Sequence, residues 1–579
     1  AAMDTFGDAT GQRRNHTKSR LLPIGAVPTH FEAMLPPPAA RRGLVLVDHI
    51  TVVKGAGSLL FGPNGMGGAV DIATRRPGEG PLVTLATETA PFHSQRLSGV
   101  ATTRGGPISA IGGVSFENVR YFPLSSSYVP TYNENGGQRE NSDRRSLTAM
   151  GKTRWEIDDR NQIVASVWHL DGQFGVPPGV YDLTRRFWRW GDWHVNSYAV
   201  AHGYRDSKTT LDETVYVSMV GNTLEVYDDA RYATQTLPAS GNSTYDDRTV
   251  GGNVRVAHRF ACTAGRCVTV RGWAGAKKDW HGSQAAAGAP WIDVDATTLT
   301  GAAQVDGPLG ERLQWLAGTQ LDGEIPGSSA ATGDLEPALG VGPMGALTYQ
   351  PHRGVDLTAG VARRTRFATL KERFSSSFGN MEPNPALGPE SATNLSLDAS
   401  TRLLRWLRVD VGVFDSEVRD LIIKLPLTTQ LSQWQNGGRA RFYGVEGSVR
   451  ARPTQWLEVW GGWAAMRMRR LDQEPPDDAI PYRPDQKGTV AVTLMPIPQV
   501  ALTVVGRHVG NQRFQNPNTM LWGELGSHQL FDARVDVTAV DGLRMWVRGT
   551  NLTDANVQGH FSYPEAGRQL FVGASWTGP

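Results

Sequence analysis

Long apolar runs are missing from this chain. Hydrophobic residues make up 40% of its 579 residues, yet no stretch approaches the ~18 uninterrupted apolar residues that a membrane-spanning helix needs. If the chain crosses a membrane, it must therefore cross with β-strands. The first residues, AAMDTFGDATGQRRN, contain no basic segment followed by an apolar one. We therefore expect that a secretion signal has been removed or that the N-terminal region is missing.

An excess of one charge is also missing. The chain carries 58 Lys and Arg against 56 Asp and Glu, which gives a formal net charge of +2. Nucleic-acid-binding proteins rely on a marked basic excess, so this balance argues against nucleic acid as a partner.

Cysteine is scarce. The two cysteines, Cys262 and Cys267, are separated by four intervening residues in FACTAGRCV, between two strand-like runs. A disulfide across such a turn is geometrically reasonable and favours an oxidising compartment such as the periplasm or cell surface. The alternative is half of a metal site, although no second Cys/His pair lies nearby to complete it.

Motifs of covalent chemistry are missing as well. The sequence contains no GxSxG, no HExxH and no isolated pair of carboxylates. A secreted β-propeller would repeat with internal similarity at about 40 to 50 residues, and the strand-like segments do not. We therefore predict that the protein is not an enzyme and holds no cofactor, with an outer-membrane hydrolase as the rival class.

Glycine, in contrast, is abundant, with 66 residues in all. A glycine-rich block runs from Asp48 to Pro77, with an apolar strand-like run on either side of its turns. Glycine adopts positive φ and allows close backbone contact without penalty, so the block predicts a tight hairpin. Taken alone, it could be a surface hairpin of a secreted protein.

The spacing in this block resembles the end of the plug domain of TonB-dependent outer-membrane receptors. The matching residues are Lys54, Gly55, Ser58, Leu60, Gly62, Gly67, Gly68, Val70, Asp71, Ile72, Thr74, Arg75, Arg76 and Pro77. Three later segments also resemble these receptors: Asn384–Asn394, Asn436–Gly447 and Asn551–Trp576. The family implies a plug inside a barrel, active uptake and energy from a periplasmic TonB complex.

After Pro77 the sequence alternates between apolar and polar residues in segments of roughly ten. In the segment from Phe531 to Ala539, for example, apolar residues alternate with Asp532, Arg534, Asp536 and Thr538. Each such strand has one apolar and one charged face. In a soluble sandwich the apolar face meets a core, whereas in a membrane barrel it meets lipid.

Short turns alternate with long polar loops along this region, which favours the barrel. Asp541-Gly542 is one of the short turns, and residues 123–142 and 513–528 form two of the long loops. Counting turns gives about 22 strands after residue 80. We predict an all-β membrane protein: a transmembrane antiparallel barrel of residues 81–579, with a small α+β plug, residues 1–80, in its lumen.

The resemblance covers only the latter half of a plug. No TonB-contacting box is visible, so the N-terminal part of the plug is expected to be missing, and the chain ends Thr577-Gly578-Pro579 where family chains normally end on an aromatic residue. We expect a monomer in the bacterial outer membrane, surrounded by outer-membrane lipid. A passive porin is a further alternative, but a porin would not need the Asp48–Pro77 block.

The resemblance implies that a scarce metal chelate, such as a ferric siderophore or haem, is the ligand. One candidate segment, predicted to lie in a long external loop, contains Arg185, Arg186, Trp188, Arg189 and Trp190. Guanidinium groups and indoles suit an anionic, aromatic chelate. The alternative is an aromatic girdle where a strand leaves the membrane.

A second candidate set lies in the predicted plug. His30 and Met34, with His16 nearby, are soft enough donors for copper. The segment from Met34 to Pro37 also resembles the MxPP segment of outer-membrane copper receptors, but it lacks the cysteine that those receptors place near this point. Copper or another bare metal is therefore kept as an alternative ligand. The other interpretation is that these side chains are ordinary polar loop residues that bind no ligand.

Overall fold

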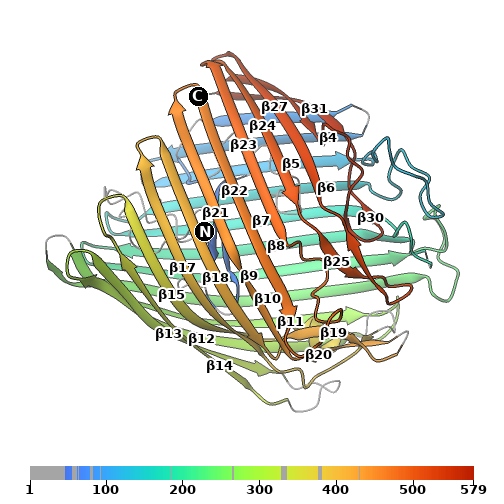
Figure 1. The fold of residues 1–579 in the computed structure, drawn as a ribbon, viewed down its shortest axis with the longest axis horizontal. Coiled ribbons are helices and arrows are strands. Elements are labelled where there is room, and N and C mark those ends of the chain that lie inside the picture. The colour runs from blue at the N-terminus through green and yellow to red at the C-terminus, as the bar shows by residue number, and fades with distance from the viewer. Residues whose placement is uncertain are drawn as a thin grey trace.

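The structure is a computed structural model, and it describes most of the chain. The described residues are 46–54, 62, 64–78, 82–91, 93–183, 185–263, 266–327, 335–375, 381–428 and 431–578. They form a large closed barrel with one short hairpin in its interior (Figure 1). No helix among them is both long and apolar enough to span a membrane.

Strand β27 (His528–Val540) shows how the alternating sequence builds the wall. Its polar side chains are the buried ones, with Asp532 1% and Asp536 3% exposed. Its apolar side chains face outward, with Phe531 40% and Val535 39% exposed. A water-soluble sandwich would show the reverse. The apolar faces therefore meet lipid and the charged faces line the lumen.

The barrel contains 22 antiparallel strands, which confirms the expected fold. They are β3 (Val83–Ala90), β4 (Ser94–Gly105), β5 (Ile108–Val119), β6 (Arg144–Glu156), β7 (Asn161–Val176), β8 (Trp188–Arg205), β9 (Thr209–Val226), β10 (Gly241–Thr263), β11 (Arg266–Gln284), β12 (Ile292–Leu309), β13 (Leu313–Pro326), β14 (Ala338–Tyr349), β15 (Val355–Arg366), β17 (Glu390–Leu404), β18 (Leu407–Arg419), β21 (Arg439–Thr454), β22 (Leu457–Arg470), β23 (Gln486–Ile497), β24 (Val500–Val509), β27, β28 (Leu543–Thr550) and β31 (Gln569–Gly578). Each strand pairs with the next, and β3 pairs with β31 to close the cylinder.

The two ends of the barrel differ. Val83 pairs with Gly578 at one end, which is also the end of the short connections, such as the Asp541-Gly542 turn between β27 and β28. We call this the short-turn end and the opposite one the long-loop end. The loops there contain α2 (Leu370–Phe374) and three small sheets. These sheets are β16 (Met381–Glu382) with β20 (Ser432–Asn436) and β19 (Ile422–Pro426), β25 (Gln512–Gln515) with β26 (Trp522–Leu525), and β29 (Gln558–His560) with β30 (Tyr563–Pro564).

Charged side chains pair with one another along the inner wall. Arg507 contacts Asp532 at 2.8 Å, and Arg534 contacts Asp536 at 2.7 Å. Arg548 on β28 reaches past β31 to Glu88 on β3, at 2.7 Å, and so bridges the closing seam. Buried charges are tolerated when they are paired in this way.

A hairpin of β1 (Val47–Lys54) and β2 (Gly68–Thr74) lies inside the barrel (Figure 1). Gly62, Met66 and Thr74, in or just before β2, hydrogen-bond to strands on widely separated parts of the wall. Lys152 of β6 donates to Thr74 Oγ1, Gln320 of β13 donates to Gly62 O at 3.2 Å, and Asn394 of β17 donates to Met66 O at 3.0 Å. One short segment therefore spans the lumen.

At the short-turn end, Cys262 and Cys267 are joined by a disulfide. They are paired neighbours on β10 and β11, close to the turn between these strands. A disulfide consumes both thiols, so neither cysteine is available as a thiolate ligand to a metal in this state.

Candidate ligand-binding mouth

A buried ion pair organises the long-loop end. Arg139 and Glu134 lie in the loop between β5 and β6, residues 120–143, with 2.8 Å between their charged atoms. Both side chains are 1% exposed. Arg139 also donates to the carbonyl oxygen of Pro178, in the loop between β7 and β8. The pair therefore ties the 120–143 loop to the 177–187 loop, and the surrounding protein excludes water from it.

The 551–568 loop, from the far end of the chain, completes this assembly. Val180 donates its backbone N–H to Ser562 O at 2.9 Å. Ser126 donates its backbone N–H to the Asp554 carboxylate, also at 2.9 Å. Three loops separated by up to 428 residues are thus joined into one rigid rim beside the lumen.

The segment Arg185–Trp190 lies only partly in a loop, so the prediction of a long external loop was wrong for its second half. Strand β8 begins at Trp188, which pairs with Val176 on β7 and Val226 on β9. The register shifts between Trp190 and Asp192, which places a bulge at Gly191. A bulge interrupts the two-residue period, so the alternation typical of a strand is not visible in this part of the sequence.

Two arginines of this segment already have carboxylate partners. Arg185 contacts Glu140 at 2.6 Å, and Arg189 contacts Asp143 at 2.6 Å. Arg189 also donates to Asn141 Oδ1 at 2.7 Å. Arg189 therefore holds the 120–143 loop against β8, Arg185 holds it against the residues just before β8, and the charge of both arginines is largely neutralised.

Arg186 is different. It is exposed, and its guanidinium lies 4.9 Å from the centre of the Trp188 ring, a cation–π arrangement. Among the described residues it forms no ion pair with a carboxylate. Trp190, in contrast, contacts Trp193 and Tyr245, at ring distances of 5.0 and 6.4 Å. Of the predicted ligand-binding residues, Arg186 and Trp188 best combine a free charge with an accessible aromatic ring.

Tyr232 packs beside the same segment, from the loop between β9 and β10, residues 227–240. Its hydroxyl donates to Glu140 at 3.3 Å, and its ring lies 6.1 Å from that of Phe187. Burial raises the pKa of Tyr232, and the neighbouring Glu140 carboxylate raises it further. The phenol therefore stays neutral and serves as a hydrogen-bond donor at physiological pH.

An aromatic cluster that the sequence analysis did not single out lies at the mouth. Its members come from four different loops, and adjacent ring centres are 3.6 to 6.3 Å apart; they are Tyr181, Phe561, Phe514, Tyr482 and His560. Tyr563 extends it, at 5.5 Å from His560. The rings come from separate loops, with Tyr181 about 300 residues before the others, so no local pattern could have predicted the cluster.

Tyr181, a member of the aromatic cluster, lies in the same loop as Arg186. Partial burial and then Asp182 raise the pKa of Tyr563, whereas the positive charges of Arg186 and Arg139 act in the opposite direction. Tyr181 is 44% exposed and Phe514 is 7% exposed, so the cluster is open to solvent at the Tyr181 end. Stacked rings beside a guanidinium can bind a flat, anionic molecule through stacking and charge together.

The remaining predicted residues precede the barrel in the sequence. His30, Met34 and Gly55 lie outside the described residues, and Lys54 ends β1, where it pairs with Gly68. Gly62 and Gly68 have φ of +88° and +135°, which only glycine adopts easily. The backbone N–H of Arg75 donates to Leu46 O at 2.7 Å. In the part of the chain that the structure describes, no group of three or more His, Cys, Asp or Glu side chains is arranged to hold a metal ion.

Solved structures of similar fold include metal transporters and a siderophore receptor. The copper transporter OprC matches with a TM-score of 0.76 and 15% identity, over 92% of this chain and 86% of its own. The iron transporter FrpB from Neisseria meningitidis, F3-3 variant, matches with 0.76 and 14%, over 92% and 87%. The siderophore receptor PirA from Acinetobacter baumannii matches with 0.74 and 13%, over 92% and 85%. No curated protein matches the sequence.

The sequence itself identifies the family. The family model described as TonB dependent receptor-like, beta-barrel, matches residues 106–552, which is well over half of the chain. The match covers the wall from the β4–β5 turn to the start of the 551–568 loop, and the closed 22-stranded barrel agrees with it. The chain therefore belongs to the TonB-dependent receptors of the bacterial outer membrane.

Proposed function

We propose that this receptor takes up a scarce metal chelate, a ferric siderophore or haem, by active transport energised through TonB. We further propose that residues 1–80 form the plug and residues 81–579 the barrel. One observation carries this proposal: residues 62–78 span the lumen and are hydrogen-bonded to β6, β13 and β17. A diffusion pore needs an open lumen. Transport through a lumen that a segment of the chain blocks needs energy to move that segment.

The mouth supports a chelate as the ligand. Arg186 over Trp188 supplies a free positive charge, and the cluster from Tyr181 to His560 supplies stacking surfaces. Ferric siderophores and haem carry negative charge on large, often aromatic, frameworks. Copper stays an untested alternative because His30 and Met34 lie outside the described residues.

Uptake assays test the proposal. Cells that express the receptor are supplied with a labelled ferric catecholate, a ferric hydroxamate, haem or copper(II), with and without TonB. We expect uptake of one chelate, and we expect that uptake to disappear without TonB. Uptake that persists without TonB would overturn active transport, and uptake of copper(II) alone would replace the chelate with the bare metal.

The mouth is tested separately with Arg186→Ala and Trp188→Ala. Both variants lose the cation–π pair, and Arg186→Ala also loses the charge. We expect chelate binding to weaken about tenfold, while the amount of protein in the outer membrane stays the same. Arg231→Ala is the matched control, because its side chain lies in the neighbouring loop and is 88% exposed. Equal affinity in all three variants would remove Arg186 and Trp188 from the site.

A tether tests the movement of the lumen segment. The native cysteines are first replaced by serine, and Met66→Cys and Asn394→Cys are then combined, because the Asn394 amide donates to Met66 O at 3.0 Å. We expect an oxidised cross-link to block uptake and a reductant to restore it. Uptake through the cross-linked receptor would show that this contact need not break.

A further inference from the structure

The outer faces of three adjacent strands change from apolar to charged at the same height. Side chains of one face recur every second residue. On the outward faces of β18, β21 and β22, Val413 and Val445 are each 45% exposed and share a cross-strand row with Ala465. The next two rows towards the long-loop end consist of Asp415, Tyr443 and Arg467, and then Glu417, Arg441 and Arg469. Tyr443 stands where aromatic residues mark the membrane interface.

When β15 and the next row are included, this outer face contains six arginines and two carboxylates. We call the outward arginines the basic sector: Arg363 on β15, Arg419 on β18, Arg439 and Arg441 on β21, and Arg467 and Arg469 on β22. Two carboxylates stand among these six arginines, which leaves a net charge of +4. Glu417 contacts Arg439 at 2.6 Å and Arg419 at 3.2 Å, and Asp415 contacts Arg441.

Half of the basic sector has no acidic partner. Among the described residues, Arg363, Arg467 and Arg469 form no ion pair, and all three are exposed. Arg470 and Asp472, next along the chain, contact each other at 3.0 Å and so leave the charge balance unchanged. Several guanidinium groups thus stand at the membrane interface with their hydrogen-bond donors free.

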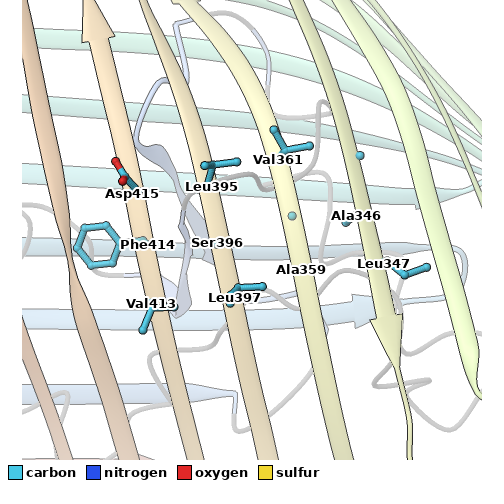
Figure 2. Close-up of a pocket in the computed structure, with 12 residues that line it drawn as sticks. Ala346, Leu347, Ala359, Val361, Leu395, Ser396, Leu397, Val413, Phe414 and Asp415 are labelled. Carbon is cyan, nitrogen blue, oxygen red and sulfur yellow. The ribbon is translucent and has the colours of Figure 1, made fainter.

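An apolar groove lies below the basic sector, towards the middle of the membrane. It has a volume of about 700 Å³ on the outer surface of β14, β15, β17 and β18. Small residues, among them Gly345 and Ala359, line it together with larger apolar side chains, some of which are labelled in Figure 2: Leu347, Val361, Leu395, Leu397 and Val413. Asp415, at the upper end of the groove, is the carboxylate that Arg441 contacts.

The outer surface of β10, β11 and β12 offers a contrast at its own interface with water. Arg248, Trp280 and Asp295 form one outward row there. Arg248 contacts Asp246 at 2.6 Å, and Lys278 contacts Asp295 at 3.0 Å, so both cations are paired. With Asp293, three carboxylates face two cations. The positive excess of the basic sector is therefore not shared by the outer surface of these three strands.

We propose that the basic sector is a binding site for the phosphate groups of a phosphorylated lipid of the outer leaflet, with an acyl chain of that lipid in the groove. Guanidinium groups bind phosphate in a bidentate way and are weakly hydrated, which suits an interface. The long loops of such barrels face the cell exterior, which places the sector at the outer leaflet. The site lies on the outside of the wall, so it is independent of the ligand that passes through the lumen.

The test uses Arg467→Gln with Arg469→Gln in the full-length receptor. The protein is reconstituted in nanodiscs of phosphatidylcholine with either phosphorylated lipid A or its dephosphorylated form, and lipid that remains bound after detergent extraction is counted by native mass spectrometry. We expect the wild type to retain the phosphorylated form. The double variant should retain about 30-fold less, because each of the two arginines near an anionic surface contributes on the order of 1 kcal/mol.

Two controls keep the proposal falsifiable. Arg248→Gln with Lys278→Gln removes the same charge from the other side, and we expect it to retain lipid like the wild type. Ala359→Leu fills the groove without changing charge and should lower retention. Equal retention by wild type and the Arg467/Arg469 variant, equal loss in the Arg248/Lys278 control, or equal binding of dephosphorylated lipid would each overturn the site.

Discussion

The two ends of the barrel are held by different kinds of contact. At the short-turn end, Asp206 accepts hydrogen bonds from the backbone N–H groups of Lys208 and Thr209, two and three residues away. At the long-loop end, Asp554 accepts from Ser126, 428 residues away. A local contact forms with its own turn, whereas a distant one requires the whole barrel to be closed. The mouth should therefore be the more vulnerable end.

The largest effect is expected at the buried pair of the mouth. Glu134→Ala leaves the Arg139 guanidinium buried without its carboxylate, which costs about 3–5 kcal/mol. We expect much faster hydrogen exchange in residues 131–140, with the barrel's thermal transition little changed. The control is Asp229→Ala, because Asp229 and Arg231 form an exposed pair at 3.9 Å, a type worth about 0–1 kcal/mol. Unchanged exchange in Glu134→Ala would show that the loops do not depend on this pair.

A smaller effect is expected where the 120–143 loop meets the 551–568 loop. Asp554→Asn weakens the bonds to Ser126 and Arg568, at 2.9 and 2.8 Å, by on the order of 1–2 kcal/mol. Hydrogen exchange at the backbone amides of Ser126 and Arg568 should rise, and exchange in the 227–240 loop should not.

The same junction should depend on pH. Burial favours a higher pKa for Asp554, but hydrogen bonds from Ser126 and Arg568 outweigh it and the pKa is lowered. A lowered carboxyl pKa means that the stabilisation is complete above the ordinary value and is lost as the pH falls through the folded-state value. We expect wild-type protection to persist to mildly acid pH, after correction for intrinsic exchange rates. Loss near neutral pH would contradict this.

A more local effect is expected in the 227–240 loop. Asp228 accepts hydrogen bonds from the backbone N–H groups of Thr236 and Leu237, at 2.8 and 3.0 Å, and from the Ser240 hydroxyl at 2.5 Å. Asp228→Ala should free the loop and speed trypsin cleavage after Arg231 by about fivefold. Arg231→Gln, which removes the cleavage site, identifies the fragment. Equal cleavage rates in the wild type and Asp228→Ala would show that other contacts, for example those of Tyr232, keep the loop ordered.

The smallest effect is expected at the short-turn end. Backbone hydrogen bonds from Lys208 and Thr209 lower the pKa of Asp206 to about 2, so this turn should keep its bonds until the pH falls through that value. Asp206→Ala should raise exchange only at these two amides and leave the thermal transition unchanged. If Asp206→Ala instead raises hydrogen exchange over as many residues at the short-turn end as Glu134→Ala does at the mouth, the two ends do not differ in the way proposed.

The wall of the barrel could be predicted from the sequence because its determinants are local. Phe531 and Asp532 differ in polarity, and their positions on opposite faces follow from adjacency alone. The prediction failed where a bulge at Gly191 interrupted the period, so that Trp188 and Trp190 were assigned to a loop. The partners of Arg185 and Arg189 lie about 45 residues upstream, in a loop whose folded path has no sequence signature.

By itself, the sequence determined the strands, their two faces, the turn lengths and the family, because each depends on neighbouring residues or on a short motif. Tertiary structure alone decided which loops meet at the mouth, that rings from four of them form one cluster, and that arginines of four strands share one outer sector. These features need the closed barrel, since only closure brings residue 126 to residue 554 and sets the height of each strand against the next.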